Sequence, residues 1–272
     1  MEHSSETVAP GVQPEFLDVG GRRIRHQILR GEGDAVVLVH GFGGNLENWR
    51  LNLVPLAAGG RTVAALDLPG HGESSRDIGS GSLGDLAMTV LGYMNAVGID
   101  RAHLVGHSMG AATCLDLTDR AVERVRSLTL VGPAGTGQKI NADFIHGFIT
   151  AGSREQLEPL MRLLFADPTF VTPQLIGDTL AYKRGEGVTT ALATIAGSRY
   201  AGTRSGGALR DVLGKVPTLV IWGADDAVIP PPPAGDLVQP GVEVHVLAGR
   251  GHMVQIEAAT EVNRLIDEFL GR

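Results

Sequence analysis

Residues 102–120 read AHLVGHSMGAATCLDLTDR, and this stretch decides the fold. The apolar run 102–107 is typical of a buried strand, and the small residues after Ser108 are typical of a helix packed closely on a sheet. A serine on such a sharp strand-to-helix turn presents its hydroxyl at the strand end, and Gly106 and Gly110 let neighbouring backbone pass close. The helix N-terminus also favours negative charge there. Ser108 is therefore a candidate nucleophile.

Further short apolar segments are spaced along the chain like the strands of a parallel sheet. They are two strands within 15–29 around Gly20-Gly21, then AVVLVH 35–40, TVAALDL 62–68, VRSLTLVG 125–132, PTLVIWG 217–223 and VEVHVLAG 242–249. Helical patterns alternate with them, such as AATEVNRLIDEFL at 258–270. This alternation predicts an α/β fold with a mostly parallel eight-stranded sheet and helices on both faces.

Residues 134–212 interrupt the alternation because they contain no strand-like run. Helical patterns around 141–151, 154–166, 172–184 and 187–199 are joined by Gly and Pro. We therefore predict a helical lid over 134–212, inserted before the penultimate strand of a core formed by 15–133 and 213–272. Residues 1–14 are polar with two prolines, and we expect a disordered tail there.

Composition narrows the classes of function. The formal net charge of −7 argues against nucleic acid or an anionic membrane as partner, so we expect a small-molecule substrate. No signal peptide and no apolar run long enough to span a membrane is visible, which favours a cytoplasmic protein. The single cysteine, Cys114, excludes an intrachain disulfide. No metal-ligand spacing or phosphate-binding loop indicates a metal or cofactor.

Two more motifs follow the last two predicted strands. IWGADDAVIP at 221–230 contains neighbouring Asp225 and Asp226, and GRGHMVQIE at 249–257 contains His252. A histidine beside Ser108 would take the hydroxyl proton, and a carboxylate would hold the imidazole in the required tautomer. These residue types predict acyl transfer through an acyl-serine intermediate.

Five motifs together resemble the α/β-hydrolase superfamily across residues 15–271: HGFGG 40–44, DLPGHGES 67–74, GHSMG 106–110, WGADDAVIP 222–230 and GHMVQIE 251–257. That superfamily orders its triad as Ser, acid, His, which matches this chain. The resemblance implies Asp226 as the acid, because related sequences place it four residues after the tryptophan and four before the proline. It also implies an oxyanion hole formed by the amides of Phe42 and Met109.

Three residues are candidates for substrate contact. Gly41 lies in the HGFGG loop, His107 precedes Ser108, and His146 falls on the predicted lid. Structural packing is the alternative for His107.

A closer resemblance extends into the lid. PAGTGQKINADFIHGF at 133–148 and LLFADP at 163–168 resemble the hydrolase-like C-terminal domain of the acyltransferase component of acetoin dehydrogenase complexes. In that family the domain follows a lipoyl domain and is described as a dihydrolipoamide acetyltransferase. Only 14 residues precede the first expected strand here and no lysine precedes Lys139, so we expect the lipoyl domain to be absent.

Three functions are consistent with these motifs. The leading one is an esterase-like serine hydrolase of a carboxylic ester, thioester or related acyl substrate. The alternative is an acyltransferase that moves an acetyl group to a thiol such as dihydrolipoamide. The third is a non-catalytic protein that binds a ligand on a hydrolase fold.

Overall fold

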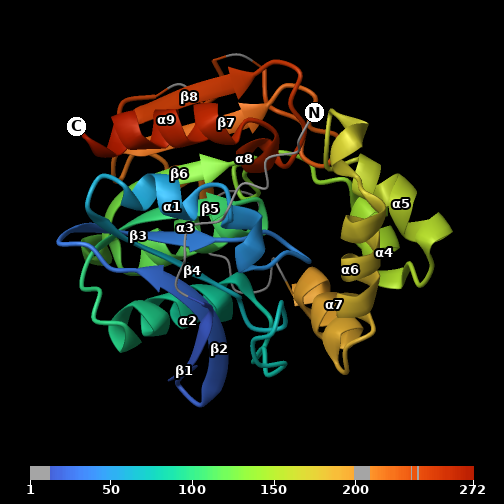
Figure 1. Cartoon of the computed structure of the whole chain (residues 1–272). Coiled ribbons are helices and arrows are strands. Elements are labelled where there is room, and N and C mark those ends of the chain that lie inside the picture. The colour runs from blue at the N-terminus through green and yellow to red at the C-terminus, as the bar shows by residue number, and fades with distance from the viewer. Residues whose placement is uncertain (1–12, 199–208, 234, 238) are drawn as a thin grey trace, which may run out of the picture.

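The computed structural model describes residues 13–198, 209–233, 235–237 and 239–272. Its centre is an eight-stranded sheet with the order β1-β2-β4-β3-β5-β6-β7-β8 (Figure 1). The strands are β1 Glu15–Val19, β2 Arg22–Leu29, β3 Gly33–Val39, β4 Arg61–Leu66, β5 Ala102–His107, β6 Val125–Val131, β7 Thr218–Gly223 and β8 Val242–Leu247. Only the pairs β1–β2 and β2–β4 are antiparallel. The predicted mostly parallel eight-stranded sheet is confirmed.

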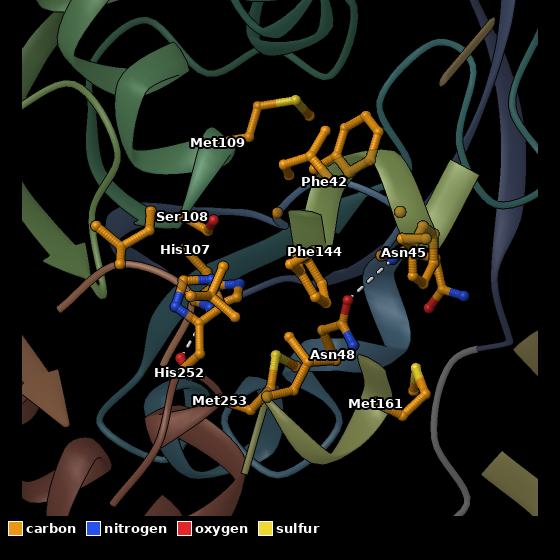
Figure 2. A pocket seen from close by; sticks show the side chains of 18 of the residues that line it. Phe42, Asn45, Asn48, His107, Ser108, Met109, Phe144, Met161, His252 and Met253 are labelled. Atoms are coloured by element: carbon orange, nitrogen blue, oxygen red, sulfur yellow. Dashed lines mark hydrogen bonds between the residues drawn. The ribbon is translucent and has the colours of Figure 1, made fainter. Parts of the chain in front are cut away.

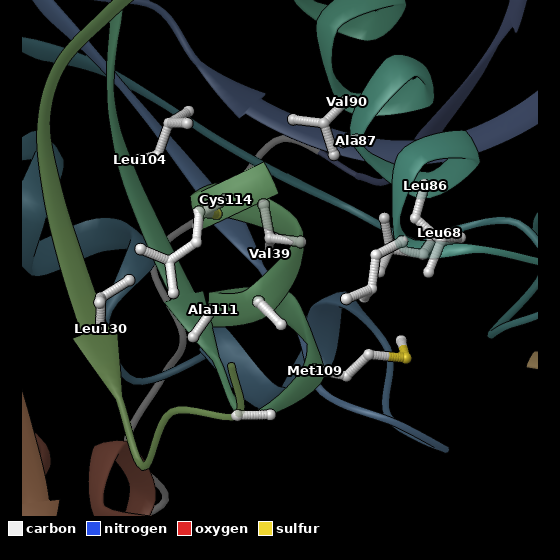
Figure 3. Close-up of a cluster of buried hydrophobic side chains, with 14 of the residues drawn as sticks. Val39, Leu68, Leu86, Ala87, Val90, Leu104, Met109, Ala111, Cys114 and Leu130 are labelled. Atoms are coloured by element: carbon white, nitrogen blue, oxygen red, sulfur yellow. The ribbon is translucent and has the colours of Figure 1, made fainter. Parts of the chain in front are cut away.

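Helices cover both faces of the sheet. Those of the core are α1 Leu53–Ala57, α2 Leu83–Ala96, α3 Met109–Arg120, α8 Val254–Glu257 and α9 Ala259–Leu270. Val37 and Val39 of β3 face the cluster that contains α2 and α3, part of which Figure 3 shows. Val36 and Leu38 face the opposite cluster, with α1 and α9. Because successive strand residues point to opposite faces and both faces are buried, the strands read as continuous apolar runs.

The lid lies between β6 and β7 in the chain and stands beside the core, beyond the carboxyl ends of the parallel strands (Figure 1). Its helices are α4 Ala142–Thr150, α5 Arg154–Arg162, α6 Pro173–Lys183 and α7 Val188–Ser198. Of the predicted tail and lid, residues 1–12 and 199–208 lie outside the described residues. Within the described part of the chain, no helix combines the length and the apolar character needed to cross a bilayer.

Helix α5 ends at Arg162, although the apolar pattern predicts helix to about residue 166. The backbone beyond it is engaged elsewhere: the Leu164 carbonyl accepts a hydrogen bond from the Met253 N–H, and the Ala166 N–H donates to the Glu257 carboxylate. These contacts with the C-terminal part of the core replace the hydrogen bonds that another helical turn would make.

The turn between β5 and α3 lies very close to neighbouring backbone. A Cβ on Gly110 would lie 2.2 Å from the Val39 carbonyl oxygen and 2.5 Å from that of His40. A Cβ on Gly106 would lie 2.6 Å from the Ala111 nitrogen. Helix α3 therefore begins in direct contact with the end of β3, and only glycine fits at these two positions.

The substitution Gly110→Ala tests this constraint. We expect it to lower the free energy of unfolding by about 2 kcal/mol or more, because two backbone carbonyls would have to move. The control is Gly177→Ala on the exposed side of α6, where nothing lies within 4 Å of an added Cβ. That change should be neutral or stabilise by up to about 1 kcal/mol, since alanine favours helix. Urea denaturation measures the free energy of unfolding of both variants. An equal loss of stability in the two would refute the explanation by close backbone contact.

Candidate active site

Ser108 has a strained backbone between β5 and α3. Its φ of 53° and ψ of −116° make it the only non-glycine residue with positive φ in the described part of the chain. The Ser108 N–H donates to the Val131 carbonyl at 2.9 Å, and its own carbonyl accepts from the Ala134 N–H at 3.2 Å. A conformation of this kind costs of order 1–3 kcal/mol and persists only where its surroundings hold it. The end of β6 holds it here.

His252 and Asp226 form a buried pair although 26 residues separate them. His252 lies between β8 and α8, Asp226 follows β7, and 2.7 Å separates His252 Nδ1 from Asp226 Oδ2. The other carboxylate oxygen accepts the N–H groups of Val228 and Ile229, each at 2.8 Å. Since Asp226 is thereby fixed as an acceptor, Nδ1 carries the proton and Nε2 is left as the basic nitrogen.

The two neighbouring aspartates lie in different environments. Asp225 is exposed, and its N–H donates to the Arg250 carbonyl at 2.9 Å. Asp226 is the one brought to His252. Gly132, with φ of +48°, leaves room for this pair, because a Cβ there would lie 3.3 Å from His252 Nδ1 and 3.4 Å from Asp226 Oδ2. Gly132 ends the predicted strand 125–132, and no local signal in the sequence indicated this role.

His107 contacts His252 rather than open space. Its Nε2 lies 3.0 Å from the His252 carbonyl oxygen and donates to it, and the two rings are 4.7 Å apart. Burial, with a smaller contribution from the nearby His252, holds the pKa of His107 well below its usual value, so the ring is neutral. Its Nδ1 faces Gly41 and has no hydrogen-bond partner among the described residues. His107 is therefore mainly a packing residue between Gly41 and His252, although it lines the cavity.

His40 shapes the loop after β3. Its Nδ1 donates to the Gly41 carbonyl at 2.7 Å, and its Nε2 accepts the Leu68 N–H at 3.0 Å. Burial lowers the pKa of His40 to about 4, which keeps the imidazole neutral and able to accept. This role of His40 was not predicted from the sequence, where its place at the start of HGFGG is the local signal.

The same loop passes close to Ser108. A Cβ on Gly41 would lie 3.0 Å from the Ser108 Cβ. Phe42 follows Gly41, Met109 follows Ser108, and all four residues line one cavity (Figure 2). Phe42 and Met109, whose N–H groups are the expected oxyanion hole, thus lie on the two segments that meet beside the Ser108 side chain.

This cavity has a volume of about 640 Å³ and lies between the core and the lid. Figure 2 shows Ser108, His107 and His252 together at one side of it. Apolar side chains dominate the wall, among them Phe42, Ile140, Phe144, Phe148, Met161, Leu164, Phe165, Phe170 and Ile195. No group of three or more His, Cys, Asp or Glu side chains in the described ranges is arranged to hold a metal ion.

His146 is not brought to this site. It is exposed on α4, whereas Phe144 and Phe148 of the same helix are buried and line the cavity. The predicted substrate contact at His146 therefore finds no support in the geometry, because this side chain lies on the outer face of the lid helix.

Comparison with known proteins agrees with this architecture. A family described as alpha/beta hydrolase fold matches residues 34–259. The dihydrolipoyllysine-residue acetyltransferase component of the acetoin cleaving system of Pseudomonas putida is 48% identical over 96% of this chain and 70% of its own length. The 2-hydroxy-6-oxo-6-phenylhexa-2,4-dienoate hydrolase of Comamonas testosteroni is 33% identical over 90% of each chain. The solved structure of such a hydrolase from Rhodococcus superposes with a TM-score of 0.84 at 25% identity, covering 96% of this chain and 99% of that one.

The likeness to the acetoin-system component confirms the closer resemblance inferred from the lid motifs. The family match runs from β3 to β8 of the sheet and includes the Ser108 turn and the segments that carry Asp226 and His252. The chain belongs to the α/β-hydrolase fold family.

Proposed function

We propose that this protein is a serine hydrolase that cleaves a carboxylic ester, a thioester or a related acyl substrate. The observation that carries the proposal is that the strained Ser108 and His252 line one apolar cavity, with the buried Asp226 carboxylate bonded to His252 Nδ1. Strained nucleophile turns and buried imidazole–carboxylate pairs are the parts that acyl transfer requires.

In the proposed reaction, His252 Nε2 accepts the proton of the Ser108 hydroxyl as Oγ attacks the acyl carbon. The N–H groups of Phe42 and Met109 donate to the oxyanion that develops, an interaction typically worth about 3 kcal/mol per donor. The tetrahedral intermediate collapses to the acyl-serine, and His252 returns the proton to the leaving group. Water then repeats the attack with His252 again as base, which releases the carboxylic acid.

The size and apolar wall of the cavity favour an acyl group that is apolar and larger than acetyl. Phenylalanine, leucine, isoleucine and methionine side chains dominate its wall, and about 640 Å³ would be largely empty around an acetyl group.

An acyltransferase is the second candidate, and the 48% identity to an acetyltransferase component favours it. Both reactions pass through the same acyl-serine and differ in whether water or a thiol resolves it.

The neighbouring aspartates provide a matched test of the acid. Asp226→Asn should lower kcat by about 10⁴-fold, because an amide no longer selects the Nδ1–H tautomer or stabilises the imidazolium. Asp225→Asn should leave kcat within a factor of a few, since Asp225 is exposed and bonds to Arg250 only through its backbone. Ester hydrolysis at saturating substrate measures both, and an inversion of the two effects would assign the acid to Asp225.

Ser108→Ala should reduce turnover to below about a thousandth of the wild-type value while the circular dichroism spectrum stays unchanged. A fluorophosphonate should label the wild-type chain at Ser108 and leave the variant unlabelled. Labelling elsewhere, or higher residual turnover, would indicate another nucleophile. An unlabelled wild type would favour a non-catalytic ligand-binding protein.

A further experiment tests whether water or a thiol accepts the acyl group. The products of an acyl ester are followed in the presence and absence of dihydrolipoamide. For the hydrolase we expect all of the acyl group to end as free acid, with unchanged product distribution as the dithiol concentration rises. Accumulation of S-acyl dihydrolipoamide above the uncatalysed background would favour the transferase. Octanoyl and acetyl esters compared side by side also test the size of the acyl group.

A further inference from the structure

Glu257 is a buried carboxylate to which the proposed chemistry assigns no role. It lies at the end of α8, five residues after His252, and is only 8% exposed. No lysine or arginine in the described part of the chain forms an ion pair with it. Burying an unpaired carboxylate is costly unless hydrogen bonds compensate for the lost water.

Backbone N–H groups supply that compensation, and they come from two distant segments. Oε1 accepts from Ala166 at 2.8 Å and from Asp167 at 3.0 Å, both in the lid loop that follows α5. Oε2 accepts from Gly251 at 2.6 Å, in the loop that carries His252. One side chain therefore joins the lid to the histidine loop with three charge-assisted hydrogen bonds.

Other contacts strengthen the same junction. The Met253 N–H donates to the Leu164 carbonyl at 2.9 Å. A Cβ on Gly251 would lie 2.6 Å from the Ala166 nitrogen and 2.8 Å from the Phe165 carbonyl carbon. The lid loop thus lies directly against the backbone on either side of His252.

The junction also adjoins the cavity wall. Leu164 and Phe165 on the lid side line the cavity, as do His252 and Met253 on the core side. A shift of either segment would move the imidazole relative to the acyl-binding wall. A displacement of about 1 Å in such a site can cost up to about a hundredfold in rate.

We propose that Glu257 is a positioning residue that holds the lid loop 163–167 and the His252 loop in one fixed arrangement. It thereby sets both the placement of the imidazole and the fit of the acyl group against Leu164 and Phe165. This inference rests on the proposed hydrolase function. Glu257 itself does not touch the reacting atoms.

The substitution Glu257→Gln tests the proposal, because an amide of the same shape has one acceptor oxygen and cannot serve both segments. Hydrogen exchange followed by mass spectrometry should show faster exchange in 163–167 and in 249–253 together. The kcat for an acetyl ester should fall about tenfold. The kcat/KM for an octanoyl ester should fall further, since the acyl wall shifts as well.

Asp116→Asn is the control, because Asp116 is another buried carboxylate, bonded to Arg120 on α3 and not part of the cavity wall. It should lower Tm. The ratio of kcat/KM for the octanoyl ester to that for the acetyl ester should stay unchanged, as should hydrogen exchange in the lid loop 163–167. Should Glu257→Gln fail to fold, Glu257→Asp keeps the charge but is too short to reach both segments, and the same pattern is expected.

Hydrogen exchange in Glu257→Gln that rises in 249–253 but not in 163–167 would overturn the proposal. An unchanged ratio of kcat/KM for the octanoyl and acetyl esters would also overturn it. A wild-type protein that turns over no ester would refute the hydrolase function alone. Hydrogen exchange would still decide whether Glu257 joins the two segments, since that readout does not depend on activity.

Discussion

The contact between Gly110 and the end of β3 is the constraint on which the site depends. A Cβ on Gly110 would collide with the carbonyl oxygens of Val39 and His40, so α3 begins directly against the loop that leads to Gly41 and Phe42. Because β3 and β5 are neighbours in the sheet, this contact places the Ser108 turn beside that loop. The strained φ of Ser108 follows, since the chain must reverse within one residue to begin α3 in so little space.

Sheet topology supplies the remaining groups. β6, β7 and β8 lie in order next to β5, and all run parallel. Their carboxyl ends therefore lie along one edge, where Gly132, Asp226 and His252 follow successive strands. Parallel sheets of this kind place ligand sites at that edge because the connecting loops meet there. The long separation between Ser108 and His252 in the chain is a consequence of this order.

The parts that could be predicted from the sequence are those with a local signal. Apolar runs and glycine-rich turns indicated the strands and the Ser108 turn, because burial on both faces and close backbone approach leave a direct mark on residue choice. Helical patterns without a strand-like run indicated the lid. The end of α5 at Arg162 and the part played by Glu257 could not be predicted in this way. Both depend on partners some 90 residues away, and a glutamate in the last position of a short helix looks like an ordinary surface residue. The sequence likewise left open which face of α4 His146 occupies, and the structure places it on the exposed face.

The buried histidines near Ser108 are compatible with a single imidazole, that of His252, as the proposed base. Burial lowers the pKa of His40 to about 4 and, with a smaller effect from His40, that of His71 to about 3. Burial likewise keeps His107 neutral, although its ring is only 4.7 Å from that of His252. A proton on His107 would repel the imidazolium that must form at His252 in the proposed transition state, at a separation where little water screens the charges. His252 differs from these three in having the Asp226 carboxylate at Nδ1 to stabilise a positive ring. Desolvation therefore keeps the three neighbouring imidazoles neutral, and among these four histidines only His252 has a carboxylate bonded to its ring.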